Sequence, residues 1–163
     1  MDTVEELAEG LAAAQLAFQA AVEAIPADRY GMGRGPGQWS PAQIVAHAIE
    51  LQPFWARQIE RMIAEAHPTI GRVDEDARRE RVAAVERGAR LDKAQAMLEL
   101  RRAAHEALEQ VRALSPDQLS RKGLLVTLET GAPEERTIRQ LIVTVLIGHL
   151  REHGEELQRL ART

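Results

Sequence analysis

Hydrophobic residues recur at spacings of three and four along most of the chain, which is the period of an α-helix with one buried face. Four stretches also open on a capping box, in which a Ser or Thr is followed three residues later by Glu or Gln, at Thr3, Ser40, Ser115 and Thr137. Together the patterns predict four long amphipathic helices at about 3–25, 41–66, 91–114 and 137–163. Such helices bury their apolar faces against one another, so the expected fold is all-α, a four-helix bundle.

The segments between these helices differ in character. Residues Pro26–Trp39 carry glycines at positions 31, 33, 35 and 37, so no regular element can run through them and a loop is expected. Residues 67–90 are dense in charge and predict a long crossover connection with a solvated helical piece at about 75–87. That charged run either faces solvent or covers the mouth of a site. Ser115 begins a short helix, and Leu124–Thr130 is a candidate extended segment.

Composition narrows the classes of function. The 163 residues are 45% hydrophobic and only 3% aromatic, which suits one helical domain spanning residues 1–163. A net charge of −4 argues against nucleic acid as a partner. The absence of cysteine excludes disulfides, thiolate metal ligands and a cysteine nucleophile. No apolar run approaches the ~20 residues that span a bilayer, and no signal peptide is recognisable, so no membrane association and a cytoplasmic location are expected.

The last predicted helix carries two histidines, His149 and His153, inside its apolar stripe. At 100° per residue, both lie within roughly 40° of one line down the helix, shared with Ile138, Ile142, Val145, Glu156 and Leu160. An unpaired buried polar group costs on the order of 1–3 kcal/mol. Two imidazoles one turn apart can avoid that cost by binding the same divalent metal.

A third histidine, His47, lies about 60° from the centre of the apolar stripe on the second helix, still on its buried side. Three neutral imidazoles on facing helices suit Zn, Ni, Fe or Mn and leave coordination positions open for water or substrate. The competing interpretation is that each histidine is a core residue bonded to a backbone group or a carboxylate. The i, i+4 pair together with a third inward histidine favours the metal. His67 and His105 are expected at the surface.

Two carboxylates of the last helix are candidates for a role beside the histidines. Glu156 lies one turn past His153 on the same stripe. Three roles are open to it there: it accepts a hydrogen bond from a metal-binding histidine, binds the metal itself, or pairs with a basic residue at the bundle end. Glu156 or Glu152 is the candidate catalytic base. A di-iron centre is not expected, because the third helix places Leu100 and Ala104 where such bundles need an inward glutamate.

Three stretches carry a resemblance to a known family. GQWSPAQIVAHAIELQPFW, LSPDQLSRKG and TIRQLIVTVLIGHLREHGEEL, in that order and spacing, resemble the DinB/YfiT-like family. The resemblance implies a four-helix bundle of crossed topology with one divalent metal on a histidine triad, which corresponds to His47, His149 and His153. It also implies frequent homodimers, and members that use a low-molecular-weight thiol such as mycothiol or bacillithiol for transfer or isomerisation of a small molecule.

Three hypotheses on function follow. In the first, the protein is an enzyme in which the metal activates a thiol that attacks a small electrophile, or activates water in a hydrolase variant. In the second, the metal site is structural and belongs to a non-catalytic stress-related protein. In the third, the chain is a plain helical interaction module whose histidines are core residues.

Overall fold

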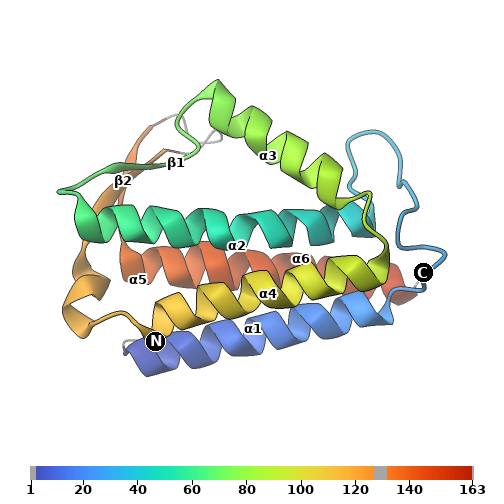
Figure 1. The fold of residues 1–163 in the computed structure, drawn as a ribbon, viewed down its shortest axis with the longest axis horizontal. Coiled ribbons are helices and arrows are strands. Elements are labelled where there is room, and N and C mark those ends of the chain that lie inside the picture. Colours follow the sequence, from blue (N-terminus) through green and yellow to red (C-terminus); the bar gives the residue numbers. More distant parts are fainter. Residues whose placement is uncertain (1–2, 127–131, 163) are drawn as a thin grey trace.

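The structure, a computed structural model, describes residues 3–126 and 132–162. Its long helices lie side by side (Figure 1). The helices are α1 (Val4–Ala24), α2 (Pro41–Ala64), α3 (Glu75–Gly88), α4 (Lys93–Arg112), α5 (Ile138–Leu141) and α6 (His149–Arg162). A 3₁₀-helical turn covers Pro116–Ser120, and a π-helical segment covers Ile142–Gly148. The four predicted long helices are confirmed, and α5, the π-helical segment and α6 together form the last of them.

Capping boxes set the starts of these helices. The side chains of Thr3, Ser40 and Thr137 each accept from the backbone N–H three residues ahead, and the side chain at that position accepts from the N–H of the capping residue. Asp92 begins α4 by the same kind of capping box with Gln95, although Asp takes the place of the Ser or Thr of the other boxes. Local sequence therefore determines where each bundle helix begins.

The bundle closes in the order α1, α4, α2, α6 and back to α1. Consecutive helices α1 and α2 therefore lie diagonally, and α2 runs parallel to its neighbour α4 (Figure 1). The parallel pairing depends on α3, which crosses back over the outer side of α2 so that α4 can begin at the same end as α2. The predicted crossover connection is confirmed, with its helical piece at Glu75–Gly88.

A small sheet lies beside the end of α2 (Figure 1) and adds to the predicted all-helical fold. Strand β1 (Thr69–Gly71) pairs parallel with β2 (Lys122–Val126), which pairs antiparallel with β3 (Glu134–Thr137). The extended segment predicted to begin at Leu124 is confirmed as far as Val126, and its remaining residues lie outside the described chain. The partners of β2 escaped prediction because β1 has three residues and β3, EERT, lacks an apolar alternation.

The last helix is not one uniform α-helix. Residues Ile142–Gly148 form a π-helical segment directly before His149, in which hydrogen bonds reach five residues instead of four. The wider turns shift the phase of the apolar stripe, so Leu146 and Ile147 are buried while Val145 is only half-buried. A spacing of 100° per residue therefore describes the buried face from His149 onward, but it does not place Val145 correctly.

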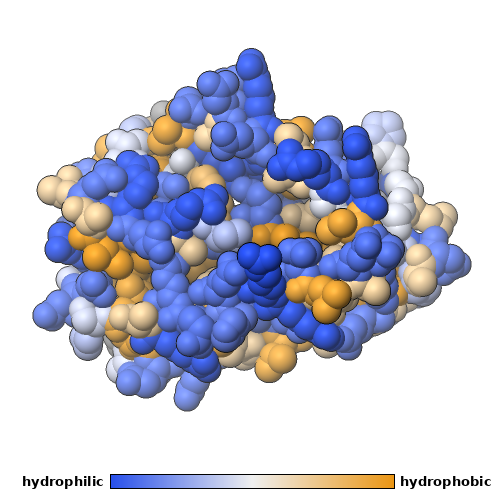
Figure 2. Space-filling model, in the orientation of Figure 1, coloured by the Kyte–Doolittle hydropathy of each residue, from blue (hydrophilic) through white to orange (hydrophobic). Residues whose placement is uncertain are grey.

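Apolar side chains from α1, α2, α4 and the last helix fill the centre of the bundle. One polar network lies among them, in which the Gln15 amide donates to Gln52 and to the Ala104 carbonyl at 2.8 Å each. The face seen in Figure 2 is mainly hydrophilic with separate apolar patches. Within the described ranges, every helix is too short or too polar to cross a bilayer.

Gly71 provides a test of how the sheet is joined to the bundle. Its φ is +96°, and a Cβ atom there would lie 2.6 Å from the Val126 carbonyl oxygen. We expect Gly71→Ala to lower the free energy of unfolding by about 1–3 kcal/mol, because the backbone conformation and the close approach both disfavour a side chain. Urea denaturation measures the change.

Gly33→Ala is the matched control, since no neighbouring atom lies within 4 Å of its Cβ position and its φ is not in the left-handed region. Equal effects of the two substitutions would contradict this account of Gly71.

Candidate metal centre

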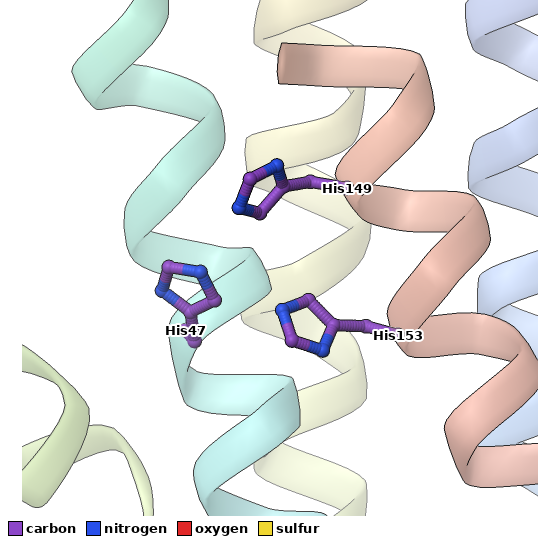
Figure 3. A group of neighbouring side chains, drawn as sticks. All are labelled: His47, His149 and His153. Atoms are coloured by element: carbon purple, nitrogen blue, oxygen red, sulfur yellow. The ribbon is translucent and has the colours of Figure 1, made fainter. Parts of the chain in front are cut away.

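Three of the five histidines meet between α2 and α6. One ring nitrogen of each of His47, His149 and His153 lies within 4.8 Å of the other two. The ring centroid of His47 is 6.0 Å from that of His149 and 5.3 Å from that of His153, and the last two are 5.7 Å apart. Figure 3 shows the three rings turned toward a common space between the helices. The structure thus brings together the three histidines that the sequence singled out.

His47 is the buried member of the triad, with 4% of its surface exposed, whereas the other two histidines are half-buried. Burial lowers the pKa of His47 to about 3, and the positive charge of Arg81 is the next cause of the shift. The imidazole is therefore neutral at pH 7 and keeps a lone pair on one nitrogen, which is the form that binds metals.

A half-buried ion pair stands behind His47. Arg72, which directly follows β1, is paired with Oε1 of Glu50, and its guanidinium also lies 3.9 Å from the centre of the Phe54 ring. The other oxygen, Glu50 Oε2, is 4.0 Å from His47 Nδ1, and neither atom has a hydrogen-bond partner among the described residues. A small shift would let Nδ1–H donate to this oxygen, which assigns Nε2 of His47 to the side of the other histidines.

A second carboxylate backs His153. Glu156 Oε2 lies 3.4 Å from His153 Nδ1, and Glu156 Oε1 accepts from Arg34 at 2.5 Å. Burial acts to raise the pKa of Glu156, but the hydrogen bonds and charges of Arg34 and His153 outweigh it and hold that pKa below its ordinary value. An ionised acceptor on Nδ1 leaves Nε2 of His153 with the lone pair. Glu156 thus contacts a histidine of the triad and pairs with a basic residue, two of the alternatives left open above.

Trp39 covers one side of the triad. Its ring centroid is 5.0 Å from that of His47 and 6.1 Å from that of His153, with which it is stacked. The Arg81 guanidinium of α3 lies over the outer part of this arrangement, 5.4 Å from the Trp39 ring centre. The charged crossover connection therefore reaches the surroundings of the site through Arg72 and Arg81.

The remaining candidates lie elsewhere. Glu152 is exposed on α6. His105 is exposed on α4, and His67 is exposed and 3.1 Å from Glu135, so both surface predictions are confirmed. Sequence reasoning missed Arg34 and the pairing of Glu50 with Arg72, because loop residues and a short strand give no periodic signal. The His47-x-x-Glu50 spacing was the available clue to Glu50.

The donor set fits a divalent metal. Zinc–nitrogen bonds of about 2.0–2.1 Å in a tetrahedral site place ligand nitrogens about 3.3 Å apart, so the three nitrogens need to approach one another only modestly. Two of the histidines have a carboxylate on the side away from the shared space, as metal-binding histidines commonly do. Neutral imidazoles can bind Zn, Ni, Fe and Mn, so the ligand set by itself does not identify the metal.

Comparison with known families identifies the class of protein that this bundle and triad define. The model of the DinB superfamily matches residues 2–157. The chain therefore belongs to the DinB superfamily, and the resemblance seen in the sequence is confirmed. A comparison with curated proteins finds no match.

Solved structures share the fold at low identity. YfiT from Bacillus subtilis, described as a probable metal-dependent hydrolase with an unusual four-helix bundle topology, matches with a TM-score of 0.77 and 18% identity over 99% of this chain and 87% of YfiT. The mycothiol-dependent maleylpyruvate isomerase matches with a TM-score of 0.76 and 13% identity over 95% of this chain and 60% of the isomerase. The colibactin self-resistance protein ClbS, in complex with double-stranded DNA, matches with a TM-score of 0.72 and 14% identity over 100% and 98%. These likenesses establish a YfiT-like bundle.

The buried histidine predicts a pH dependence of stability. The pKa of His47 is about 3 in the folded protein and about 6.5 when unfolded, so the unfolded state binds the extra proton between these values. We expect the unfolding free energy of metal-free protein to fall as the pH is lowered from about 6.5 toward 3, by up to about 1.4 kcal/mol per pH unit from this one group. Denaturation of metal-free wild type and His47→Gln across this range tests the prediction, and equal slopes would contradict it.

The carboxylates behind the triad are expected to contribute to the affinity for the metal. We expect Glu50→Ala and Glu156→Ala each to weaken affinity for a divalent ion by about 10–100-fold, because each removes an acceptor facing a ligand imidazole. Competition with a chromophoric chelator measures the affinity.

Glu152→Ala is the control for this pair, since it removes an exposed carboxylate from the same helix. Its affinity should equal that of wild type, and a loss as large as that of Glu156→Ala would refute the assignment.

Proposed function

We propose that this protein is a metal-dependent enzyme in which His47, His149 and His153 hold one divalent ion, and that it uses a low-molecular-weight thiol to transform a small electrophile. The observation that carries the proposal is the convergence of three imidazoles, two of them backed by buried or half-buried carboxylates. The ion is Zn, Ni, Fe or Mn, since the imidazole set suits each of them.

The metal, when bound, lowers the pKa of a thiol or water and polarises a carbonyl group. The protein residues hold and surround the reactants. Glu50 and Glu156 orient His47 and His153, and Trp39 shields one side of the triad from water. A cavity of about 300 Å³ adjoins Trp39 and Glu156, which is the lower end of the range for small-molecule sites.

The nucleophile must come from outside the protein, because the chain has no cysteine. A thiol such as mycothiol or bacillithiol meets this need, and the fold shared with the mycothiol-dependent isomerase supports the choice. Cytosolic thiols are kept reduced, so we place the reaction in the cytoplasm. We assign the handling of the proton to Glu156 instead of Glu152, because Glu156 is the half-buried carboxylate at the triad.

A hydrolase is the second candidate. His149 and His153 are half-buried, so water can reach the same centre without a thiol, and the bundle is that of a probable metal-dependent hydrolase. A non-catalytic metal protein is the third, and it differs from both enzymes in requiring no response of the metal to thiol or substrate.

Two further features of the proposal concern partners. We propose a homodimer, an expectation that rests on the family, and light scattering of the purified protein tests it.

We also propose that the ligand is a small molecule and not nucleic acid, because the net charge is −4 and DNA binding needs a basic face. Retardation of a DNA duplex by this protein at moderate salt would overturn that proposal.

Metal content tests the first step. We expect about one equivalent of divalent metal in freshly purified wild type and a large loss in His149→Ala, because two imidazoles hold a metal far less well than three. Elemental analysis after gel filtration measures it. His105→Ala removes an exposed histidine and should retain the metal of wild type.

Thiol titration of the Co(II)-loaded protein then separates the candidate functions. A thiolate charge-transfer band supports the thiol-dependent enzyme. A Co(II) spectrum that does not change on addition of thiol favours the hydrolase or the structural role. If wild type binds no metal after reconstitution, the three histidines are core residues and not metal ligands.

A further inference from the structure

A pocket beside the triad has the chemistry of an anion site. Its volume is about 300 Å³, and its lining residues are Arg34, Gly37, Gln38, Trp39 and Glu156. Two of these residues also contact the triad. The Trp39 ring is 5.0 Å from that of His47, and Glu156 Oε2 is 3.4 Å from His153 Nδ1. A molecule in this pocket therefore lies next to the side chains that would hold the metal.

Arg34 is held in the wall of this pocket by one of its terminal nitrogens. Nη1 donates to the Trp39 carbonyl at 3.1 Å and to Glu156 Oε1 at 2.5 Å, which uses both of its hydrogens. In the part of the chain that the structure describes, Nε and Nη2 make no hydrogen bond. The guanidinium is thus oriented while one edge, with parallel N–H groups, stays available. That edge matches a carboxylate, which it can bind through two hydrogen bonds.

The loop that carries Arg34 is shaped by its glycines. Gly35 and Gly37 have φ of +109° and +75°, and Gln38 N–H donates to the Gly35 carbonyl at 3.2 Å to close a turn. Both glycine conformations are strained for other residues. The turn places Arg34 and Trp39 on the same pocket, which gives this glycine-rich stretch a role that its sequence alone did not reveal.

A further positive charge lies beside the pocket. The charge of Arg34 is offset by Glu156, and Arg81 lies 5.4 Å from the Trp39 ring centre. The charge of Arg81 is strong enough at the triad to help lower the pKa of His47. A divalent ion on the triad would add two further charges, so the field favours an anionic group in the pocket.

We propose that this pocket binds a carboxylate, or a comparably shaped anionic group, of the small molecule that reacts at the triad, and that Arg34 is the residue that recognises it. The inference rests on the proposed function and deepens it, because it names the ligand as a small acid with its reactive group a short distance from its anionic end. The flat Trp39 ring offers an apolar surface to the carbon skeleton between the two.

Two thiols of the same size test the proposal. 3-Mercaptopropionate and 3-mercaptopropionamide differ in the charge of one end, and each is titrated into Co(II)-loaded protein while the visible spectrum is followed. We expect wild type to bind the acid at least about tenfold more tightly than the amide, in line with a charge-assisted bidentate contact. In Arg34→Gln this preference should fall to within about twofold.

Three variants isolate the role of Arg34. Arg34→Lys keeps the positive charge and can still pair with Glu156, but it lacks the planar edge, so most of the preference should be lost. Glu156→Gln should retain or increase the preference, since Arg34 then has one competitor less. Arg102→Gln removes an exposed arginine that pairs with Glu106 on α4, and its preference should equal that of wild type.

The outcomes distinguish the two proposals. Equal affinity for the acid and the amide in wild type, or a preference that survives in Arg34→Gln, would overturn the anion site while leaving the metal centre intact. Failure of wild type to bind Co(II) would overturn the proposed function. The anion site is then judged on metal-free protein, where propionate must shift the Trp39 indole N–H resonance in wild type but not in Arg34→Gln, and propionamide must leave it unchanged. No shift with propionate would overturn it.

Discussion

Desolvation of the histidines is the constraint on which the site depends. His47 is 4% exposed in a bundle filled mainly with apolar side chains, and an imidazole in such a place must be neutral and needs partners for its ring nitrogens. The Glu50 carboxylate lies 4.0 Å from its Nδ1 and is largely withdrawn from water. A buried carboxylate is tolerated only with a cation beside it, and Arg72 provides one. The His47 imidazole thus depends on the Glu50 carboxylate, and that carboxylate depends in turn on the Arg72 guanidinium.

This requirement explains the elements that lie outside the four-helix core. Arg72 reaches Glu50 because β1 ends at Gly71, whose backbone approaches Val126 so closely that no side chain would fit. Arg81 approaches the triad because α3 crosses the outer side of α2. The connection between α2 and α4 therefore both permits the parallel arrangement of these helices and brings two guanidinium groups to the site.

The shared fold does not decide the reaction. Structures with TM-scores of 0.72 to 0.77 to this chain include a probable metal-dependent hydrolase, a thiol-dependent isomerase and a self-resistance protein seen with DNA. One bundle thus carries different chemistries, and function must be argued from the site. In this chain the pocket beside the triad is formed by Arg34, Trp39 and the glycine turn between them, which belong to a loop and not to the bundle.

Local sequence determined the helices and the identity of the three histidines. Periodicity and capping are properties of neighbouring residues, so the starts at Thr3, Ser40 and Thr137 and the inward direction of His47, His149 and His153 could be predicted without a structure. Glu156 was placed beside His153 by the same helical geometry. The π-helical turns before His149 were not predictable, because Ile142–Gly148 is apolar at nearly every position and its sequence therefore shows no shift of phase.

Tertiary structure alone decided what surrounds the triad. Arg34 meets Glu156 across 122 positions of sequence, and Arg72 meets Glu50 only after the chain has turned through a three-residue strand. Neither contact follows from periodicity, because each joins a segment without regular spacing to a helix elsewhere in the chain. The three histidines and the carboxylates beside them could be located from the sequence because they share faces of helices, whereas Arg34 and Arg72, which pair with those carboxylates, are brought in by the loop and the crossover.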